Sequence, residues 1–160
     1  MNYHKIFIND SYNKIIIDSL KYLLIEHKAK LFAYVIMPSH LHLLLYIPIN
    51  ESIIDFMRDF KKFTSIEIRK LAQKENRYDL LEKFKLNARA VKNQKYKVWM
   101  DRFDDLIIIS DKQFRIKINY IHFNPVKAKL VNEPEDFIYS SARNYLKNDQ
   151  TIINITTVGV

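Results

Sequence analysis

The sequence predicts an α+β domain in which helices pack on an antiparallel sheet, and three observations support this fold class. Short runs of β-branched and aromatic residues alternate with longer stretches of helical periodicity. Two of the short runs are separated only by Pro38 and Ser39, a spacing that predicts a tight hairpin and therefore an antiparallel pair. The chain of 160 residues is long enough to bury a single core.

The elements are expected in the order strand, helix, hairpin, helix, strand and helix, with one more short helix near the end. Apolar residues at helical spacing mark the helices, and β-branched or aromatic runs mark the strands. The expected strands cover residues 3–8, 31–37, 40–47 and 96–109, the last interrupted by Asp104 and Asp105. The expected helices cover residues 11–28, 51–74, 111–124 and 140–147, and residues 75–94 are read as a loop with a fragment of helix.

Capping residues and one proline set the expected helix ends. Ser11 and Asp111 are residue types that cap helix N-termini, so the first and third long helices are expected to begin beside them. Pro125 disfavours helical geometry at the residue before it, and Asn124 is therefore expected at the end of its helix.

Composition limits the chemistry that the chain can carry. It has no cysteine, which excludes disulfides, thiolate zinc sites and cysteine nucleophiles. Its only glycine is Gly159, so no glycine-rich phosphate loop is present and nucleoside-triphosphate chemistry is not expected. No window approaches ~20 uninterrupted apolar residues and no leader pattern opens the chain, so a cytoplasmic location is expected. One domain is expected over residues 1–147, followed by a C-terminal tail over residues 148–160.

The net charge of +8 is concentrated in the middle of the chain. Residues 58–97 contain 13 Lys and Arg against 5 Asp and Glu, with aromatic residues interleaved. This pattern suits a polyanion, because cations contact phosphates while rings stack on bases, although a solvated helix face explains the charge equally well. The candidate DNA-binding residues are Lys61, Lys62 and Arg69, followed by Arg102 and Lys117.

The segment "MPSHLHLLLY" carries two histidines on one face of an expected strand. Side chains alternate along a strand, so His40 and His42 point to one side and the intervening leucines point to the core. Residues two apart lie ~6.5 Å apart at Cα, near enough for both imidazoles to reach one metal ion. A pair of half-buried structural histidines is the alternative interpretation.

The helix expected over residues 111–124 carries a polar stripe beside its buried face. At 100° per residue, Lys117, Tyr120 and Asn124 lie along this stripe. If Asn124 gave an oxygen to the ion held by the histidines, Tyr120 would stand about one phosphate group away from that ion. Such an arrangement suits cutting and joining of nucleic acid, because a phenol can attack phosphorus while a metal polarises a phosphoryl oxygen.

The phenol needs assistance in this chemistry. A free phenol ionises near pH 10, which leaves only ~0.1% phenolate at neutral pH. The metal and nearby cations such as Lys117 are expected to assist, and the sequence identifies no general base.

Four segments in order, "AYVIMPSHLHLLL", "DFKKFTS", "YIHFNPVKAKLV" and "EDFIYSSARNYL", resemble the single-tyrosine transposases of the HUH endonuclease superfamily, in particular the REP-associated tyrosine transposases. The resemblance covers about residues 11–147. It implies that Tyr120 is the nucleophile and that His40, His42 and Asn124 are the metal ligands. It also implies a ferredoxin-like fold, a Mg²⁺ or Mn²⁺ ion, and cleavage of single-stranded DNA beside hairpins that leaves a 5′-phosphotyrosine and a free 3′-hydroxyl.

Three features depart from the family pattern. Ser39 stands where asparagine is usual before the first histidine, and Lys129 replaces a glycine that usually follows the helix. The first expected strand, at the edge of the sheet, is short. All four residues expected to carry the chemistry are present.

The sequence therefore predicts a metal-dependent tyrosine transposase that acts on single-stranded or hairpin DNA, without membrane contact and as a monomer or a homodimer. One alternative is a non-catalytic, domesticated protein that only binds hairpin DNA. Another is a metal phosphoesterase that uses water. Two imidazoles and an amide oxygen suit Mn²⁺, whereas Mg²⁺ prefers oxygen ligands. No organic cofactor is expected.

Other aromatic and histidine residues have structural explanations. His4 and His27 are expected to be structural, and His122 is expected to be structural or to contact phosphate. Trp99 is expected in the core, while Phe103 is a candidate for stacking on a base.

Overall fold

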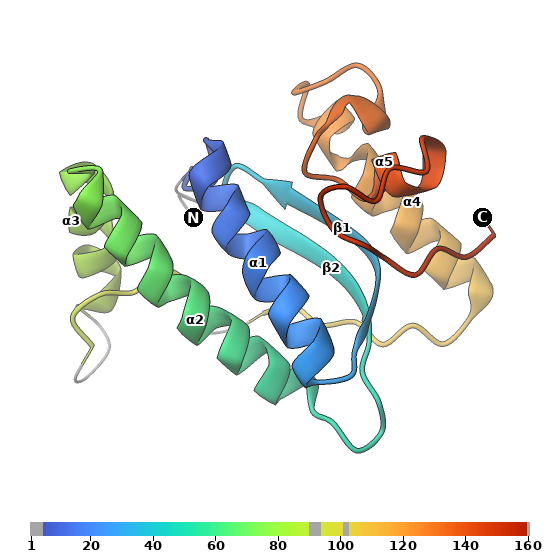
Figure 1. Cartoon of the computed structure of the whole chain (residues 1–160), viewed down its shortest axis with the longest axis horizontal. Coiled ribbons are helices and arrows are strands. Elements are labelled where there is room, and N and C mark those ends of the chain that lie inside the picture. Colours follow the sequence, from blue (N-terminus) through green and yellow to red (C-terminus); the bar gives the residue numbers. More distant parts are fainter. Residues whose placement is uncertain (1–4, 90–93, 101–102, 160) are drawn as a thin grey trace.

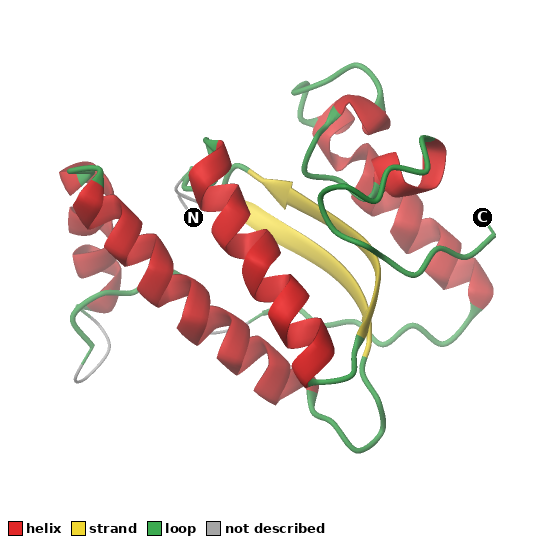
Figure 2. Cartoon of the chain, in the orientation of Figure 1, coloured by secondary structure: helices red, strands yellow, loops and turns green. Residues whose placement is uncertain are grey.

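The computed structural model describes residues 5–89, 94–100 and 103–159 as a sheet with helices on both faces. The sheet has two strands, and α1 and α2 lie on one side of it while α4 and α5 lie on the other (Figures 1 and 2). Both α1 and α4 contact β1, so the first strand is covered from both sides.

The elements follow one another along the chain with short connections, apart from the segment between α3 and α4. Their bounds are α1 Asp10–Glu26, β1 Lys30–Met37, β2 His40–Tyr46, α2 Ile53–Lys74, α3 Tyr78–Ala88, α4 Asp111–Lys127, the 3₁₀ turn η1 Pro134–Asp136 and α5 Ala142–Leu146. The α+β class and the antiparallel sheet are therefore confirmed.

The hairpin forms where the sequence predicts it. Pro38 and Ser39 make the turn, and the strands pair with Met37 opposite His40 and Val35 opposite His42. A bulge between Leu31 and Ala33 interrupts the register near the far end. The strand alternation predicted from the sequence holds along β2, so both histidines point to the same face.

The outer edge of β1 is covered by the C-terminal part of the chain. The backbone N–H of Ile36 donates to the Tyr139 carbonyl at 3.0 Å, and that of Ser141 donates to the Tyr34 carbonyl at 2.9 Å. Further along the strand, the Thr156 N–H donates to the Leu31 carbonyl at 2.9 Å. These bonds satisfy backbone groups that an open edge would leave to solvent or to another chain.

Each face of the sheet packs into its own apolar cluster. On the first face, Tyr34 and Ile36 pack with residues of α1, α2 and α3, and Leu41, Leu43 and Leu45 are partly buried against the same cluster. On the second face, the buried strand residues pack against α4. These are Ala33, Val35, Met37 and Leu44 from the strands with Ile118 and Ile121 from the helix.

Two expected strands do not form in the described residues. Residues 5–8 run in irregular backbone, and the N–H groups of Ile6 and Phe7 both donate to the Pro38 carbonyl, at 2.8 and 2.9 Å. Residues 96–100 and 103–109 also form no strand. In the first segment, the two N–H donors share one carbonyl, which is not the pattern of a β-ladder. In the second segment, the apolar residues after Asp104 and Asp105 have no neighbouring strand to pair with.

The helices differ from expectation at their ends. Asn9 caps α1 instead of Ser11, and Ser110 caps α4 instead of Asp111, each by accepting an N–H three residues on. Residues 75–94 hold an eleven-residue helix, α3, where mostly loop was expected. Its apolar side chains give it a buried face, and this tertiary contact outweighs the polar composition of the segment.

Helix α4 continues through Pro125 to Lys127, so the expectation that it ends at Asn124 was wrong. The proline removes only one N–H from the last turn, and its ring is buried. Its carbonyl accepts the N–H of Leu130 at 2.9 Å, which closes the helix end. Lys129 follows in left-handed backbone with a φ of 56°. None of the described helices is long and apolar enough to cross a membrane.

Replacing Lys129 with glycine is expected to stabilise the fold by about 0.5 kcal/mol, because glycine adopts the left-handed conformation without a Cβ clash. Urea unfolding of the two proteins measures this difference. Arg115→Gly, at an exposed position inside α4, is the matched control and is expected to cost about 1 kcal/mol. A destabilised Lys129→Gly variant would contradict the left-handed backbone conformation at residue 129.

Candidate functional site

Two histidines lie side by side at the start of β2, on the face of the sheet that α4 covers. The ring centroids of His40 and His42 are 5.0 Å apart, with the rings nearly perpendicular at 84°. The Ser39 hydroxyl lies 3.1 Å from Nδ1 of His40. The strand geometry thus brings both imidazoles to one place, as the sequence predicts.

Both imidazoles are neutral at physiological pH. Burial lowers the pKa of His40, and it lowers the pKa of His42 to about 4 with a further contribution from His40 and Lys117. A neutral imidazole keeps a lone pair on one ring nitrogen, and this is the form that binds metal ions. The two rings are therefore chemically ready to act as ligands.

Helix α4 brings Tyr120 to the histidine pair. Its ring centroid is 5.4 Å from that of His42, with an angle of 81° between the planes. The buried side chains of Ile118 and Ile121 hold α4 against the sheet, which sets the rotation of the helix. Tyr120 is 41% exposed, so the residue is accessible from solvent.

Two lysines flank the ring of Tyr120. The ammonium of Lys117 lies 5.0 Å from the ring centroid, and that of Lys127 lies 5.5 Å from it. Lys127 was not among the residues expected at the site, because the helix was expected to stop before it. The spacing of seven residues from Tyr120, which is close to two helical turns, is the signal that identifies it.

Asn124 lies one helical turn after Tyr120 on α4 and is half-buried. Within the described ranges, no three His, Cys, Asp or Glu side chains gather into a metal cluster. A metal held by the two imidazoles would therefore need a further ligand of another type, and a carboxamide oxygen is one such ligand. This is the role that the sequence resemblance implies for Asn124.

The other histidines have structural roles or lie outside the described residues. His122 is buried on the opposite side of α4, where its Nε2 lies 2.9 Å from the Ser141 hydroxyl. His27 packs on Phe56 at the end of α1, with its Nδ1 3.1 Å from Glu51. His4 lies outside the described residues.

The DNA-binding candidates are divided between the two faces of the molecule. Lys117 lies beside Tyr120, whereas Lys61, Lys62 and Arg69 lie on α2, in the layer on the other side of the sheet. Lys61 donates to the Met100 carbonyl at 2.8 Å, and Lys62 is exposed. Arg102 lies outside the described residues.

Trp99 and Phe103 both pack against α2. The indole N–H of Trp99 donates to the Thr64 hydroxyl at 2.8 Å, and its ring stacks on Phe7 with centroids 5.5 Å apart. The core position expected for Trp99 is thus confirmed. The Phe103 ring lies 5.4 Å from the Lys61 ammonium and is half-buried.

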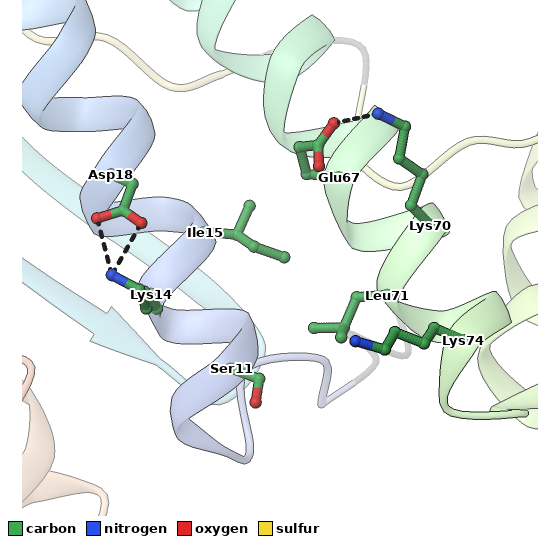
Figure 3. A pocket seen from close by; sticks show the side chains of 8 residues that line it. All are labelled: Ser11, Lys14, Ile15, Asp18, Glu67, Lys70, Leu71 and Lys74. Carbon is green, nitrogen blue, oxygen red and sulfur yellow. Dashed lines mark hydrogen bonds and ion pairs between the residues drawn. The ribbon is translucent and has the colours of Figure 1, made fainter.

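A groove between α1 and α2 offers no comparable chemistry (Figure 3). Two of its lysines are neutralised by acidic neighbours on their own helices, Lys14 by Asp18 and Lys70 by Glu67. These pairs are exposed and contribute little to stability. The groove contains no histidine or aromatic residue among its lining side chains.

Comparison with known proteins identifies the family. The family model described as IS200-like transposase matches residues 1–86, more than half of the chain, and this region includes the histidine-bearing strand. The chain belongs to the IS200-like transposase family. The matched residues of this IS200-like chain end before α4, so the family match does not include Tyr120. It is the tertiary structure that places Tyr120 beside the histidine pair.

Two relatives of this IS200-like chain are REP-associated tyrosine transposases, which agrees with the sequence resemblance. A Haemophilus influenzae protein of that name is 30% identical over 115 residues, or 72% of this chain. The chain spans 60% of the length of that curated relative. A solved structure of a REP-associated tyrosine transposase bound to a REP hairpin has a TM-score of 0.65 and 18% identity, covering 100% of this chain and 80% of that one.

The pH dependence of stability is expected to depend on His122. Burial lowers the pKa of His122 from 6.5 to about 4, so the unfolded chain binds a proton between these pH values that the folded chain does not bind. The free energy of unfolding therefore falls as the pH drops through this window. The free energy of unfolding is expected to fall by about 2 kcal/mol less between pH 7 and pH 5 in His122→Gln than in the wild type.

Urea unfolding of the wild type and His122→Gln at both pH values measures this difference. Glutamine keeps an N–H donor for the Ser141 hydroxyl, so the comparison isolates the titration. Equal slopes of stability against pH in the two proteins would show that His122 contributes nothing to this loss.

Proposed function

We propose that this transposase-family protein cuts and rejoins single-stranded DNA beside hairpins, with Tyr120 as the nucleophile and a divalent metal ion at the histidine pair. The observation that carries the proposal is the contact between the Tyr120 ring and the His42 ring. These residues lie 78 positions apart in sequence and come from different elements, yet the fold brings them together. A phenol, two neutral imidazoles and two ammonium groups at one exposed place form a set suited to phosphodiester transfer.

In the proposed reaction, the oxygen of Tyr120 attacks phosphorus and a new phosphorus–oxygen bond forms. The bond between phosphorus and the 3′-oxygen breaks, the phenol releases its proton, and the 3′-oxygen takes up a proton as it leaves as a hydroxyl. The products are a 5′-phosphotyrosine and a free 3′-hydroxyl. Because one phosphodiester replaces another, rejoining by the reverse attack needs no nucleoside triphosphate.

The residues present fit a divalent ion of the Mg²⁺ or Mn²⁺ type. His40 and His42 would hold it through ring nitrogens that burial keeps unprotonated, and Asn124 would add an amide oxygen. When bound, the ion polarises a phosphoryl oxygen and stabilises the negative charge that develops on it. The mixed nitrogen and oxygen donor set favours Mn²⁺ over Mg²⁺.

Lys117 and Lys127 support the same reaction from the sides of the ring. Their ammonium groups are near enough to the phenol to contact a phosphate placed against its oxygen. Positive charge at this position orients the phosphodiester and counteracts the negative charge of a phenol that loses its proton.

One chain supplies both the imidazoles and the phenol, so the proposed site needs no residue from a second copy. This supports action within a monomer, and it is compatible with a homodimer that brings together two such sites. We further propose hairpin DNA as the substrate. The structural relative bound to a REP hairpin and the net charge of +8 both support this choice.

A covalent adduct assay tests the nucleophile. Wild type incubated with Mn²⁺ and labelled single-stranded DNA carrying a hairpin is expected to form an adduct that survives denaturing electrophoresis, whereas Tyr120→Phe is expected to form none. Tyr78→Phe, at an exposed tyrosine on α3, is the control and is expected to react like wild type. Abundant adduct with Tyr120→Phe, or none with wild type, would falsify the proposal.

The metal site is tested with His42→Ala and with His40→Ala. Each variant is expected to bind Mn²⁺ at least tenfold more weakly in calorimetry and to form adduct correspondingly slowly, since loss of one ligand opens the coordination shell. Binding of hairpin DNA in the presence of chelator is expected to match wild type, because the imidazoles carry no charge. Adduct formation with unaltered Mn²⁺ dependence in both variants would eliminate the histidine pair as the metal site.

A further inference from the structure

The described parts of the most basic stretch of the chain lie far from Tyr120 in the fold. Residues 83–97 contain six Lys and Arg and no Asp or Glu. Their first part forms the second half of α3, and residues 94–97 return beside it, where the Lys97 N–H donates to the Phe84 carbonyl at 2.9 Å. Figure 1 places α3 and α4 toward opposite ends of the long axis of the molecule.

Three cationic side chains from different segments converge on one aromatic ring there. The Arg69 guanidinium from α2 lies 5.5 Å from the Tyr96 ring centroid, the Lys85 ammonium from α3 lies 5.9 Å from it, and the Lys95 ammonium lies 5.8 Å from it. We refer to these four residues as the Tyr96 cluster. Lys85 and Lys95 were not among the candidates that the sequence suggested.

Within the part of the chain that the structure describes, no carboxylate pairs with these three cations. Lys14 and Lys70 in the groove between α1 and α2, by contrast, are both paired. Three positive charges around one ring repel one another, and the attraction of each to the ring only partly offsets this. An anionic partner would remove the repulsion.

The Tyr96 cluster suits the phosphates of a duplex better than the unstacked bases of a single strand. Three cations lie 5.5 to 5.9 Å from the centroid of the half-buried Tyr96 ring, and each of them competes with a base for contact with that ring. A duplex keeps its bases stacked inside and presents its phosphates outside, and proteins hold it through such backbone contacts. The face of α4 is different, because Tyr120 and Phe123 are 41% and 46% exposed beside lysines, which suits unstacked bases.

We propose that the Tyr96 cluster binds the phosphate backbone of the duplex stem of a hairpin, while the α4 face holds the adjoining single strand. This inference rests on the proposed function in one respect, because it takes hairpin DNA as the substrate. A stem of ten base pairs is about 34 Å long, so a single hairpin can reach surfaces that lie well apart on a small protein.

Binding measured in the presence of chelator tests this proposal without any cleavage. The double variant Lys85→Gln/Lys95→Gln is compared with Lys21→Gln/Lys28→Gln, which removes the same charge from two exposed positions, one within α1 and one just after it, that form no ion pair among the described residues. Two ligands are used: a hairpin with a single-stranded tail, and the same tail without the stem. Lys85→Arg/Lys95→Arg keeps the charge and serves as the rescue variant.

We expect the cluster variant to bind the hairpin on the order of tenfold more weakly than the control variant at 0.15 M salt, as the loss of two phosphate contacts requires. For the cluster variant, the magnitude of the slope of log affinity against log salt concentration is expected to decrease by about 1.8. The stemless tail is expected to show a much smaller difference between the two variants, and the arginine variant is expected to bind the hairpin like wild type.

Three outcomes would overturn the inference. They are equal hairpin binding by the cluster and control variants, an equal loss on the hairpin and the stemless tail, and failure of the arginine variant to restore binding. A wild type that binds no hairpin at all would refute the proposed function as well. A wild type that binds the hairpin through the cluster but forms no adduct would refute only the nuclease proposal.

Discussion

The packing of α4 on the sheet is the contact on which the rest of this molecule depends. Ile118 and Ile121 are buried against Ala33 and Val35 of β1, and this contact sets both the position and the rotation of the helix. One consequence is that Tyr120 meets His42, two residues from the buried Ile118. Burial of His122 against Ser141 on the other side of the helix adds a polar anchor to the apolar one. A rotation of α4 by a single residue, about 100°, would take the phenol away from the imidazoles.

The same packing gives the site its electrostatic character. Burial keeps the two imidazoles uncharged, so the positive charge near Tyr120 comes from Lys117 and Lys127. The two kinds of group suit different tasks, because neutral ring nitrogens bind a metal ion while ammonium groups attract phosphate. In the proposed function, a polyanionic substrate would meet positive charge around the phenol and the proposed metal ligands behind it.

The two-sided sheet also separates two basic regions. The α4 face combines lysines with exposed aromatic rings, while the Tyr96 cluster combines three cations with a ring that they surround. Since the core lies between these surfaces, neither can substitute for the other. The proposed reaction beside a hairpin requires recognition of both a stem and a strand, and two chemically distinct surfaces would meet that requirement.

Local pattern alone determined the hairpin, the shared face of His40 and His42, and the spacing of Tyr120 and Asn124, because strand alternation and helical periodicity involve only near neighbours along the chain. Tertiary contacts decided the rest. The chain carries α4 through Pro125 because the proline ring is buried, and this is what places Lys127 beside Tyr120. The expected outer strands do not form in the described residues because they find no ladder partner, and α3 forms because its apolar face is buried. The meeting of Tyr120 with His42 joins residues far apart in sequence, and only the packing of helix on sheet can bring them together.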